Sequence, residues 1–255
     1  ELDIATQGRI RARLQGRGQE DGDLALDGQA GLTLEDLTWM DPLIPQVRDL
    51  KGRVRGDLDI GGSLQAPRLD GRLVLSEGSV TLPEAGFTLK DMRLDLHNEG
   101  RERLRLDGRL RSGEGSLTLE GDVQRADDGP PPVRLQIQGE DFLALRRPDV
   151  QAVISPDLNI TAIGRRVIVT GDVAVPRALL ELAELPPQAV TVSGDEVIVQ
   201  EAREETGAPL LVVARVGVTL GEEVRIRGYG LDARLGGELQ VQQSPGLPTR
   251  LLGQI

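Results

Sequence analysis

The sequence predicts an all-β protein built as a long antiparallel β-meander of many strands. The main observation is an alternation of aliphatic and polar residues that recurs almost from end to end. In residues 116–124, for example, Leu117 and Leu119 share one parity, whereas Thr118 and Glu120 share the other. A period of two places the aliphatic side chains on one face of a β-strand and the polar side chains on the opposite face. The 32 glycines and 15 prolines supply the turns that many short strands require.

The alternating segments follow one another along the whole chain. They are residues 22–28, 52–62, 71–80, 92–98, 103–110, 133–139, 166–176, 189–200, 216–228 and 237–242. Glycine or Asp-Gly closes most of them and adopts the positive φ angles of tight hairpin turns, so we expect neighbouring strands to pair antiparallel. The irregular spacing excludes a strict solenoid repeat. We expect one elongated β-domain over residues 1–255, as part of a longer protein.

Two segments depart from this alternation. Within residues 31–50 apolar residues recur at intervals of three and four, which predicts a short helix. These residues are Leu37, Met40, Leu43, Ile44, Val47 and Leu50. Pro42 and Pro45 indicate an irregular start, because proline is tolerated only in a first turn. The helix would either cap one end of the sheet or lie as a plug on its aliphatic face. Residues 176–187 are compatible with a short helix or with a strand.

Composition excludes several classes of function. The net charge of −11 argues against nucleic acid as a partner, because such binding relies on Lys and Arg neutralising phosphates. The chain contains no cysteine, which excludes disulfides and thiolate metal sites. No apolar run approaches the roughly 18 residues that indicate a transmembrane helix.

Candidate catalytic groups are few. His97 is the only histidine and alternates with Asp95 on the polar side of a predicted strand, which favours a solvated residue. One histidine without cysteine leaves no common zinc or nucleophile constellation, and the acid-rich segments lack the spacing of a calcium loop. The glycine-rich segments 113–121 and 228–230 do not lead into a helix, so they do not fit a phosphate loop. We expect no enzyme, cofactor or metal site.

The apolar parity of the segments is almost wholly aliphatic. Phe87, Phe142, Trp39 and Tyr229 are the only aromatic residues, 2% of the chain, whereas a closed core of this size would normally use aromatics as its largest fillers. The pattern fits either a plain core of small aliphatic residues or the lining of an open groove. The residues predicted to line such a groove are Val54, Leu58, Ile60, Leu73, Leu75, Leu94, Leu96, Leu104, Leu106, Leu117, Leu119, Leu135, Ile137, Val167, Val169, Val173, Val175, Val190, Val192, Val197, Val199, Val218, Leu220, Val224, Ile226, Leu239 and Val241.

Several segments, taken in order, resemble one protein family. They are LTWMDPLIPQVRDLKGRVRGDLDIGGSLQAPRLDGRLVLSEGSVTLPEAGFTLKDMRLDL (37–96), SPDLNI (155–160), VTGDVAVPRALLELAELPPQAVTVSGDEVIV (169–199) and LGEEVRIRGYGLDARLGGELQVQQSPGLPTRLLGQI (220–255). The ordered set carries the resemblance, with Ser-Pro-Asp-Leu before a Gly-x-Val-x-Val-Pro strand and a late Gly-Tyr-Gly-Leu. Over roughly residues 31–255 the chain resembles the C-terminal region of the TamB family, the inner-membrane component of the translocation and assembly module. That family is similar to AsmA-like and bridge-like lipid-transfer proteins.

The resemblance implies a fold, a location and partners. Proteins of this family are anchored in the inner membrane of Gram-negative bacteria by an N-terminal segment and cross the periplasm as a long β-structure. Their C-terminal end meets TamA, an outer-membrane barrel. The implied fold is a β-taco, a curved sheet folded lengthwise around a hydrophobic groove. The family is linked to phospholipid movement and to outer-membrane protein assembly. We expect this chain to be a periplasmic piece without the anchor or the extreme C-terminal segment.

These expectations combine into one functional hypothesis. A sheet of about 15 to 18 strands would extend roughly 70–85 Å along the hydrogen-bonding direction. Its groove would conduct phospholipid acyl chains between the inner and outer membranes, at about 0.8 kcal/mol for each buried methylene. The alternative is a chaperone or assembly scaffold for outer-membrane β-barrel proteins and autotransporters, which would pair client strands with open sheet edges. A closed sandwich or a structural spacer is a third interpretation.

Overall fold

The computed structural model describes residues 2–4, 8–18, 24–62, 67–100, 103–124, 130–182 and 210–254. The strands of this part of the chain, sixteen in number, all belong to one sheet. They are β1 (Leu2–Ile4), β2 (Gly8–Gly18), β3 (Leu24–Leu34), β4 (Arg48–Gly62), β5 (Pro67–Leu82), β6 (Phe87–Glu99), β7 (Arg103–Ser112), β8 (Gly115–Gln124), β9 (Val133–Glu140), β10 (Phe142–Arg146), β11 (Val150–Ile163), β12 (Arg166–Glu181), β13 (Leu211–Gly228), β14 (Leu231–Arg234), β15 (Gly237–Gln243) and β16 (Arg250–Gln254). The predicted all-β class is confirmed.

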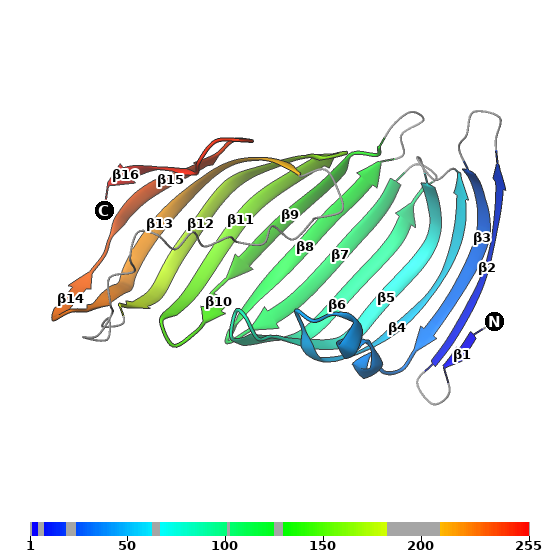
Figure 1. Cartoon of the computed structure of the whole chain (residues 1–255), viewed down its shortest axis with the longest axis horizontal. Coiled ribbons are helices and arrows are strands. Elements are labelled where there is room, and N and C mark those ends of the chain that lie inside the picture. Colours follow the sequence, from blue (N-terminus) through cyan, green and yellow to red (C-terminus); the bar gives the residue numbers. More distant parts are fainter. Residues whose placement is uncertain are drawn as a thin grey trace, which may run out of the picture.

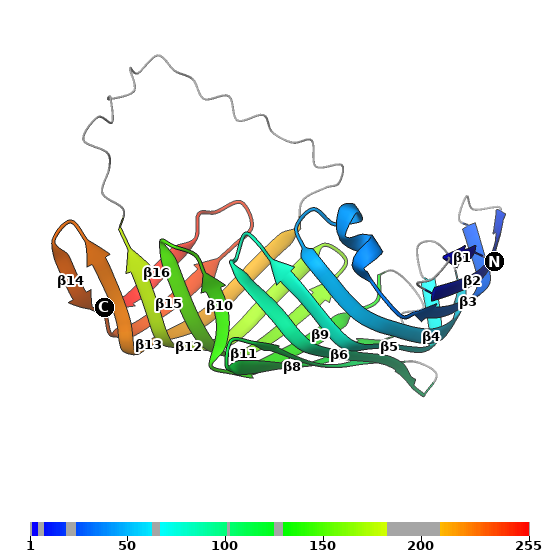
Figure 2. The ribbon, with the colours of Figure 1, turned by 90° about the horizontal axis from the view of Figure 1, so that it is seen from below.

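The order of strands in the sheet follows the order of the chain (Figure 1). Fourteen strands form one hydrogen-bonded path from β1 to β16, while β10 pairs with β11 and β14 pairs with β13 outside that path. β1 and β16 are the two edges, and within the described residues they do not pair with each other. Figure 2 shows that the sheet curves strongly along its length. The fold is therefore an open, curved β-meander and not a closed barrel.

One pair of neighbouring strands departs from the antiparallel meander. β12 and β13 run parallel, with Val169 opposite Ala214, so the expectation of antiparallel neighbours is wrong here. Parallel neighbours need a connection of a dozen or more residues, and residues 183–209 supply that length. The strand predicted at 189–200 lies outside the described residues. Of the segment 176–187, the part up to Glu181 continues β12 as a strand.

Glycines occur inside strands as well as in turns. Gly164 occupies a hairpin turn with a φ of 56°, as expected. Gly71 and Gly171, in contrast, lie within β5 and β12 with φ angles of 138° and 129°. A Cβ atom at these positions would lie 2.0 Å from the carbonyl oxygen of Asp57 or 2.1 Å from that of Asp157, respectively. These glycines therefore permit a close approach of two backbones and do not reverse the chain.

A line of irregular positions crosses the sheet near one end of its strands. Register shifts interrupt the pairing of β4, β5, β6, β11, β12 and β13. Four non-glycine residues near this line have φ angles close to 50°, namely Asp49, Glu77, Asp91 and Asp141. Bulges bend a strand and increase its twist, so this end of the sheet curls. We call it the bulged rim; β10 and β14 lie along it (Figure 1).

The helical segment is shorter than the one expected within residues 31–50. A 3-10 helix, η1 (Thr38–Leu43), takes its place, because β3 continues to Leu34 and β4 already begins at Arg48. Pro42 lies inside η1, where its missing N–H limits the hydrogen bonds that could extend a helix.

Asp41 ties η1 to the sheet. Its carboxylate accepts hydrogen bonds from the backbone N–H groups of Asp49 and Leu50, each at 2.9 Å. Leu37, just before η1, is buried, whereas the side chain of Leu43 is 68% exposed. Leu43 therefore points away from any surface that η1 could cover.

Candidate functional site

One face of the sheet carries an unbroken row of aliphatic and glycine residues. Directly opposed residues of adjacent strands lie on the same face, so the register traces the row from strand to strand. From β4 to β15 the row is Val54, Leu75, Leu94, Gly108, Leu119, Ile137, Leu158, Gly171, Val216 and Val241. A parallel row is Gly56, Leu73, Leu96, Leu106, Gly121, Leu135, Ile160, Val169 and Ala214. We call this surface the aliphatic face.

The structure brings most of the predicted lining residues together on this face. Eleven of them are members of the two rows, and most of the others share the parity of the row members on their own strands. Val224 and Ile226 lie beyond a bulge of β13, opposite Ala178 and Leu180. Four predicted lining residues, Val190, Val192, Val197 and Val199, lie outside the described residues.

Sequence reasoning missed several members of the rows. Leu158 and Ile160 of β11 belong to them, as do Val216 and Ala214 of β13. The alternation in residues 154–162 was a signal that could have identified the first two. The glycines were also missed, because only aliphatic residues were assigned to the lining. Gly108 shows their role: a Cβ there would lie 2.8 Å from Cδ2 of Leu94 and 3.1 Å from Cβ of Leu119.

The aliphatic face is not sealed by a second layer. The buried hydrophobic residues of the described chain are Leu34, Leu37, Val80, Leu110, Phe142 and Val224. Val224 is the only predicted lining residue among them, and the other described lining residues are half-buried. In a β-sandwich, such a face would be packed against a second sheet. Here the aliphatic side chains remain partly accessible to water.

The aliphatic face lies on the concave side of the sheet. β10 pairs only with β11 among the described strands, yet it also contacts β6, β7 and β8. The rings of Phe87 and Phe142 meet edge to face at 6.1 Å and 82°, and the Ser112 hydroxyl donates a hydrogen bond to the carbonyl of Leu143 at 2.8 Å. A strand can reach a partner several places away only across the concave side. Leu110, which has the parity of the aliphatic face on β7, is buried in this corner.

The convex side carries ion pairs, both between adjacent strands and within one strand. Nε of Arg72 on β5 donates to Oδ1 of Asp95 on β6 at 2.9 Å. On β7, Nε of Arg105 lies 3.1 Å from Oδ1 of Asp107, and Nη2 of Arg105 lies 3.2 Å from Oε2 of Glu120 on β8. At least one partner of each pair is well exposed to water, so each pair stabilises the sheet only slightly. Together they keep this side of the sheet polar.

Arg72 also shifts the protonation of its partner. Its hydrogen bond and positive charge lower the pKa of Asp95, and His97 adds a smaller effect in the same direction. Nδ1 of His97 lies 3.4 Å from Oδ1 of Asp95. The imidazole is 34% exposed, so the expectation of a solvated histidine holds only in part.

The described residues contain no group of His, Asp and Glu side chains that could hold a metal ion. Within the same residues, no helix is both long and apolar enough to cross a membrane. Of the glycine-rich segments noted in the sequence, 113–121 contains the turn between β7 and β8 and the first part of β8. The segment 228–230 connects β13 and β14.

The fold and the aliphatic face define an elongated open-sheet protein that presents a water-accessible apolar surface across many strands. A family model for the TamB C-terminal domain matches residues 102–255, and a model for the TamB N-terminal domain matches residues 1–75. The chain belongs to the TamB family. The match at residues 1–75 extends beyond the C-terminal region to which the sequence resemblance pointed.

A curated relative agrees with this assignment. The chain is 26% identical over 272 residues to the translocation and assembly module subunit TamB of Haemophilus influenzae. The match covers 100% of the chain and 20% of that relative, so the chain spans about a fifth of the relative's length. No solved structure matches the chain.

Proposed function

We propose that the aliphatic face conducts phospholipid acyl chains along the sheet. The observation that carries this proposal is the row from Val54 to Val241, which is aliphatic or glycine on ten successive strands yet stays half-buried. An acyl chain on this face gains about 0.8 kcal/mol for each methylene removed from water. The rows contain no polar side chain between β4 and β13, so each position offers a similar apolar surface. A sliding acyl chain therefore meets no position that binds it much more tightly than the next.

The family assignment supports a role in the translocation and assembly module. By extension, we propose that this chain lies in the periplasm, that the whole protein is anchored in the inner membrane, and that its C-terminal end meets a TamA-type outer-membrane barrel. The part played by the present chain would then be transport without catalysis. Acyl chains are the ligand, and no cofactor takes part.

Photo-crosslinking in cells tests the conduit. A photoreactive amino acid at Leu119 or Val169 should capture phospholipid, because both residues are members of the two rows. The matched controls are Glu120 and Thr170, the next residue along each strand, whose side chains point to the opposite face. Equal labelling of both faces, or no labelling at either, would remove the basis for the proposal.

A second candidate function is the assembly of outer-membrane β-proteins. It is favoured by β16, an edge strand in which every residue is exposed, including Leu251 at 65% and Leu252 at 49%. An exposed edge with unpaired backbone groups can bind an extended client strand. The material that co-purifies with the protein discriminates the two functions: extractable phospholipid favours the conduit, and a bound extended peptide favours the scaffold.

A further inference from the structure

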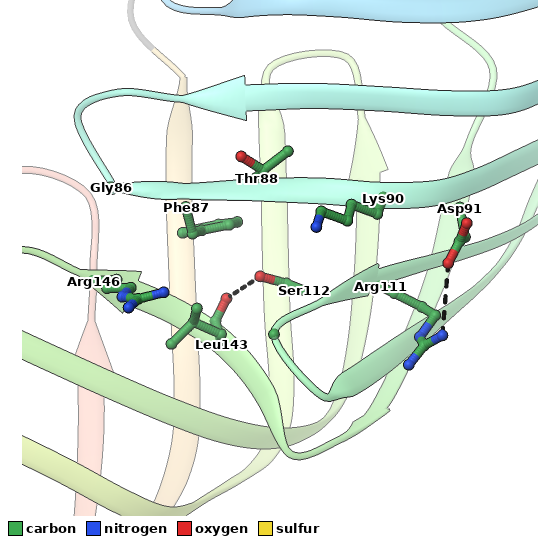
Figure 3. A pocket seen from close by; sticks show the side chains of 10 residues that line it. Gly86, Phe87, Thr88, Lys90, Asp91, Arg111, Ser112, Leu143 and Arg146 are labelled. Atoms are coloured by element: carbon green, nitrogen blue, oxygen red, sulfur yellow. Dashed lines mark hydrogen bonds and ion pairs between the residues drawn. The ribbon is translucent and has the colours of Figure 1, made fainter.

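A hollow of about 430 Å³ lies at the bulged rim, between the start of β6, the end of β7 and β10 (Figure 3). Three cationic side chains line it: Lys90 of β6, Arg111 of β7 and Arg146 of β10. One carboxylate, Asp91, shares the lining, and its Oδ2 lies 3.6 Å from Nη1 of Arg111. The lining therefore carries two net positive charges in a chain whose net charge is −11.

Two of these cations lie on neighbouring strands, and Arg146 lies at the other end of the hollow (Figure 3). Lys90 and Arg111 are directly opposite each other in the register of β6 and β7, where like charges repel. Arg93 and Arg109, the neighbouring pair, repeat the arrangement. Within the described residues, Lys90 and Arg146 form no salt bridge. An anion bound in the hollow would offset this repulsion.

Backbone contacts hold the hollow in shape. The backbone N–H of Arg146 donates to the carbonyl of Ala85 at 2.8 Å. Gly86, with a φ of 75°, lies so close to β10 that a Cβ there would be 1.9 Å from the carbonyl oxygen of Arg146. The turn before β6 and the strand β10 are thus fixed against each other, so ligand binding would cost little ordering of the backbone.

The hollow lies where the two sides of the sheet meet at the rim. Lys90 and Arg111 have the parity of the convex side, whereas Phe87 shares the parity of Leu89, which lies opposite Ser112 on the concave side. Phe87 and Leu143 line it together with the cations, and Phe87 packs against Phe142 in the corner under β10. Leu143 also lines a second hollow of about 490 Å³, together with Arg177, Arg225, Arg227 and Glu223. Both hollows are thus lined by several cationic side chains together with apolar ones.

We propose that the hollow at Lys90, Arg111 and Arg146 binds a phosphate group, and that an anionic phospholipid headgroup supplies it. Guanidinium and ammonium groups form short, charge-assisted hydrogen bonds with phosphate oxygens. With the phosphate held there, Phe87 directs the acyl chains toward the aliphatic face. The lipid source rests on the proposed conduit function, whereas the anion site rests on the hollow alone. Free phosphate has the same chemistry and is the other possible source.

A lipid-loading experiment tests the proposal. Purified chain is incubated with vesicles of dioleoyl phosphatidylglycerol or of dioleoyl phosphatidylcholine, separated from them, and assayed for bound lipid. These lipids share their acyl chains and differ in headgroup charge. We expect wild-type protein to load the anionic lipid about tenfold better, because a tenfold preference requires only about 1.4 kcal/mol. The triple variant K90Q/R111Q/R146Q should lose this preference and keep its loading of phosphatidylcholine.

The matched control is R55Q/R103Q/R134Q, which removes the same charge from the convex side of the sheet. Each of these arginines forms an exposed salt bridge, with Glu35, Glu99 and Asp122 respectively. The control should keep the tenfold preference. A preference that survives in the hollow variant, or one that disappears equally in the control, would overturn the proposal, because net charge and not the hollow would then explain it.

A second measurement separates the anion site from the conduit. Inorganic phosphate and glycerol 3-phosphate are titrated into the wild-type chain while the amide resonances of Gly86 and Gly113 are followed by NMR. Shifts in wild type and control, but not in K90Q/R111Q/R146Q, support the anion site even if neither lipid is loaded. In that case the conduit fails and free phosphate is the source. Identical spectra with and without either anion overturn the site.

Discussion

Leu110 and Leu106 lie four residues apart on the same face of β7, yet they have different surroundings. Leu110 is 8% exposed in the corner that β10 closes, whereas Leu106 is half-buried on the open aliphatic face. The same residue type, strand and parity thus yield a core residue at one end and an accessible surface residue toward the middle. Whether a side chain of this sheet is buried depends on the strand that covers it.

This comparison shows how one sheet can be both stable and open. In the closed corner, Leu110 of β7 and Phe142 of β10 are buried where β10 folds back over β6, β7 and β8. Along the open face most described aliphatic residues are half-buried, and buried ones such as Leu34 and Val224 are isolated. Stability there depends mainly on the continuous hydrogen-bonded ladder, on half-buried Leu–Gly pairs such as Leu119 and Gly108, and on the ion pairs of the convex side. The closed corner holds the shape, and the open face remains available to a ligand.

The largest expected difference between the two regions comes from a buried charge. Leu110→Asp places a carboxylate where it has no partner and no water, and should lower the free energy of unfolding by about 4 kcal/mol or more. Leu106→Asp should cost about 1–2 kcal/mol, because its carboxylate can reach solvent. Urea denaturation of both variants measures the difference.

Lipid loading of the same pair completes the test. Leu106→Asp should bind less phospholipid than wild type while remaining folded, because an acyl chain avoids a charged carboxylate. If the two variants lose equal stability, or if the loading of Leu106→Asp falls only as far as its stability does, the open face is a closed core and the comparison fails.

A smaller effect is expected at the glycines that bring backbones close together. At Gly171 a Cβ would lie 2.1 Å from the carbonyl oxygen of Asp157, with the backbone at a φ of 129°. Gly171→Ala should therefore lower the free energy of unfolding by about 1–3 kcal/mol. Gly100 is the matched control, since it has a φ of 75° but a Cβ there would have no heavy atom within 4 Å. Gly100→Ala should cost about 1 kcal/mol or less.

The same glycines show what the sequence can predict and what it cannot. Alternation predicts the face of each side chain, because parity within a strand is a local property, and this is why the lining of β4–β9 was predictable. It does not predict which strands become neighbours after a long connection, as with the parallel pair β12–β13. Nor does it separate a turn glycine such as Gly164 from a strand glycine such as Gly171, because both are preceded by an alternating segment. The hollow at Lys90 and Arg146 depends on β10 folding back, a contact between distant segments.

A further prediction concerns whether η1 covers the aliphatic face. Met40 and Leu43 would have to contact the face if η1 acted as a plug, but Leu43 is 68% exposed. The double substitution Met40→Ser and Leu43→Ser should change the free energy of unfolding by only about 0.5 kcal/mol, as is typical of surface positions. Phospholipid occupancy should equal that of wild type. Increased occupancy in the variant would instead show that η1 competes with lipid.

The smallest effect is expected on the convex side, behind the open face. Because Arg72 lowers the pKa of Asp95, the folded state favours the ionised carboxylate. The resulting stabilisation is present above the pKa of Asp95 in the unfolded chain, about 3.9, and is lost as the pH falls from there through the lower pKa of the folded state. Arg72→Gln should raise the pKa of Asp95 toward its usual value and weaken the loss of stability in acid, as measured by NMR titration of the carboxyl group. Arg103→Gln removes a salt bridge between β7 and Glu99 of β6, the strand that also carries Asp95, and should leave the Asp95 titration unchanged. Asp95 lies on β6 between Leu94 and Leu96 of the two rows, so this pair lies directly behind the open face. An unmoved pKa in Arg72→Gln would mean that the Arg72–Asp95 pair does not favour the folded state there, and that the backbone ladder and the glycine contacts are the stronger contributors at this position.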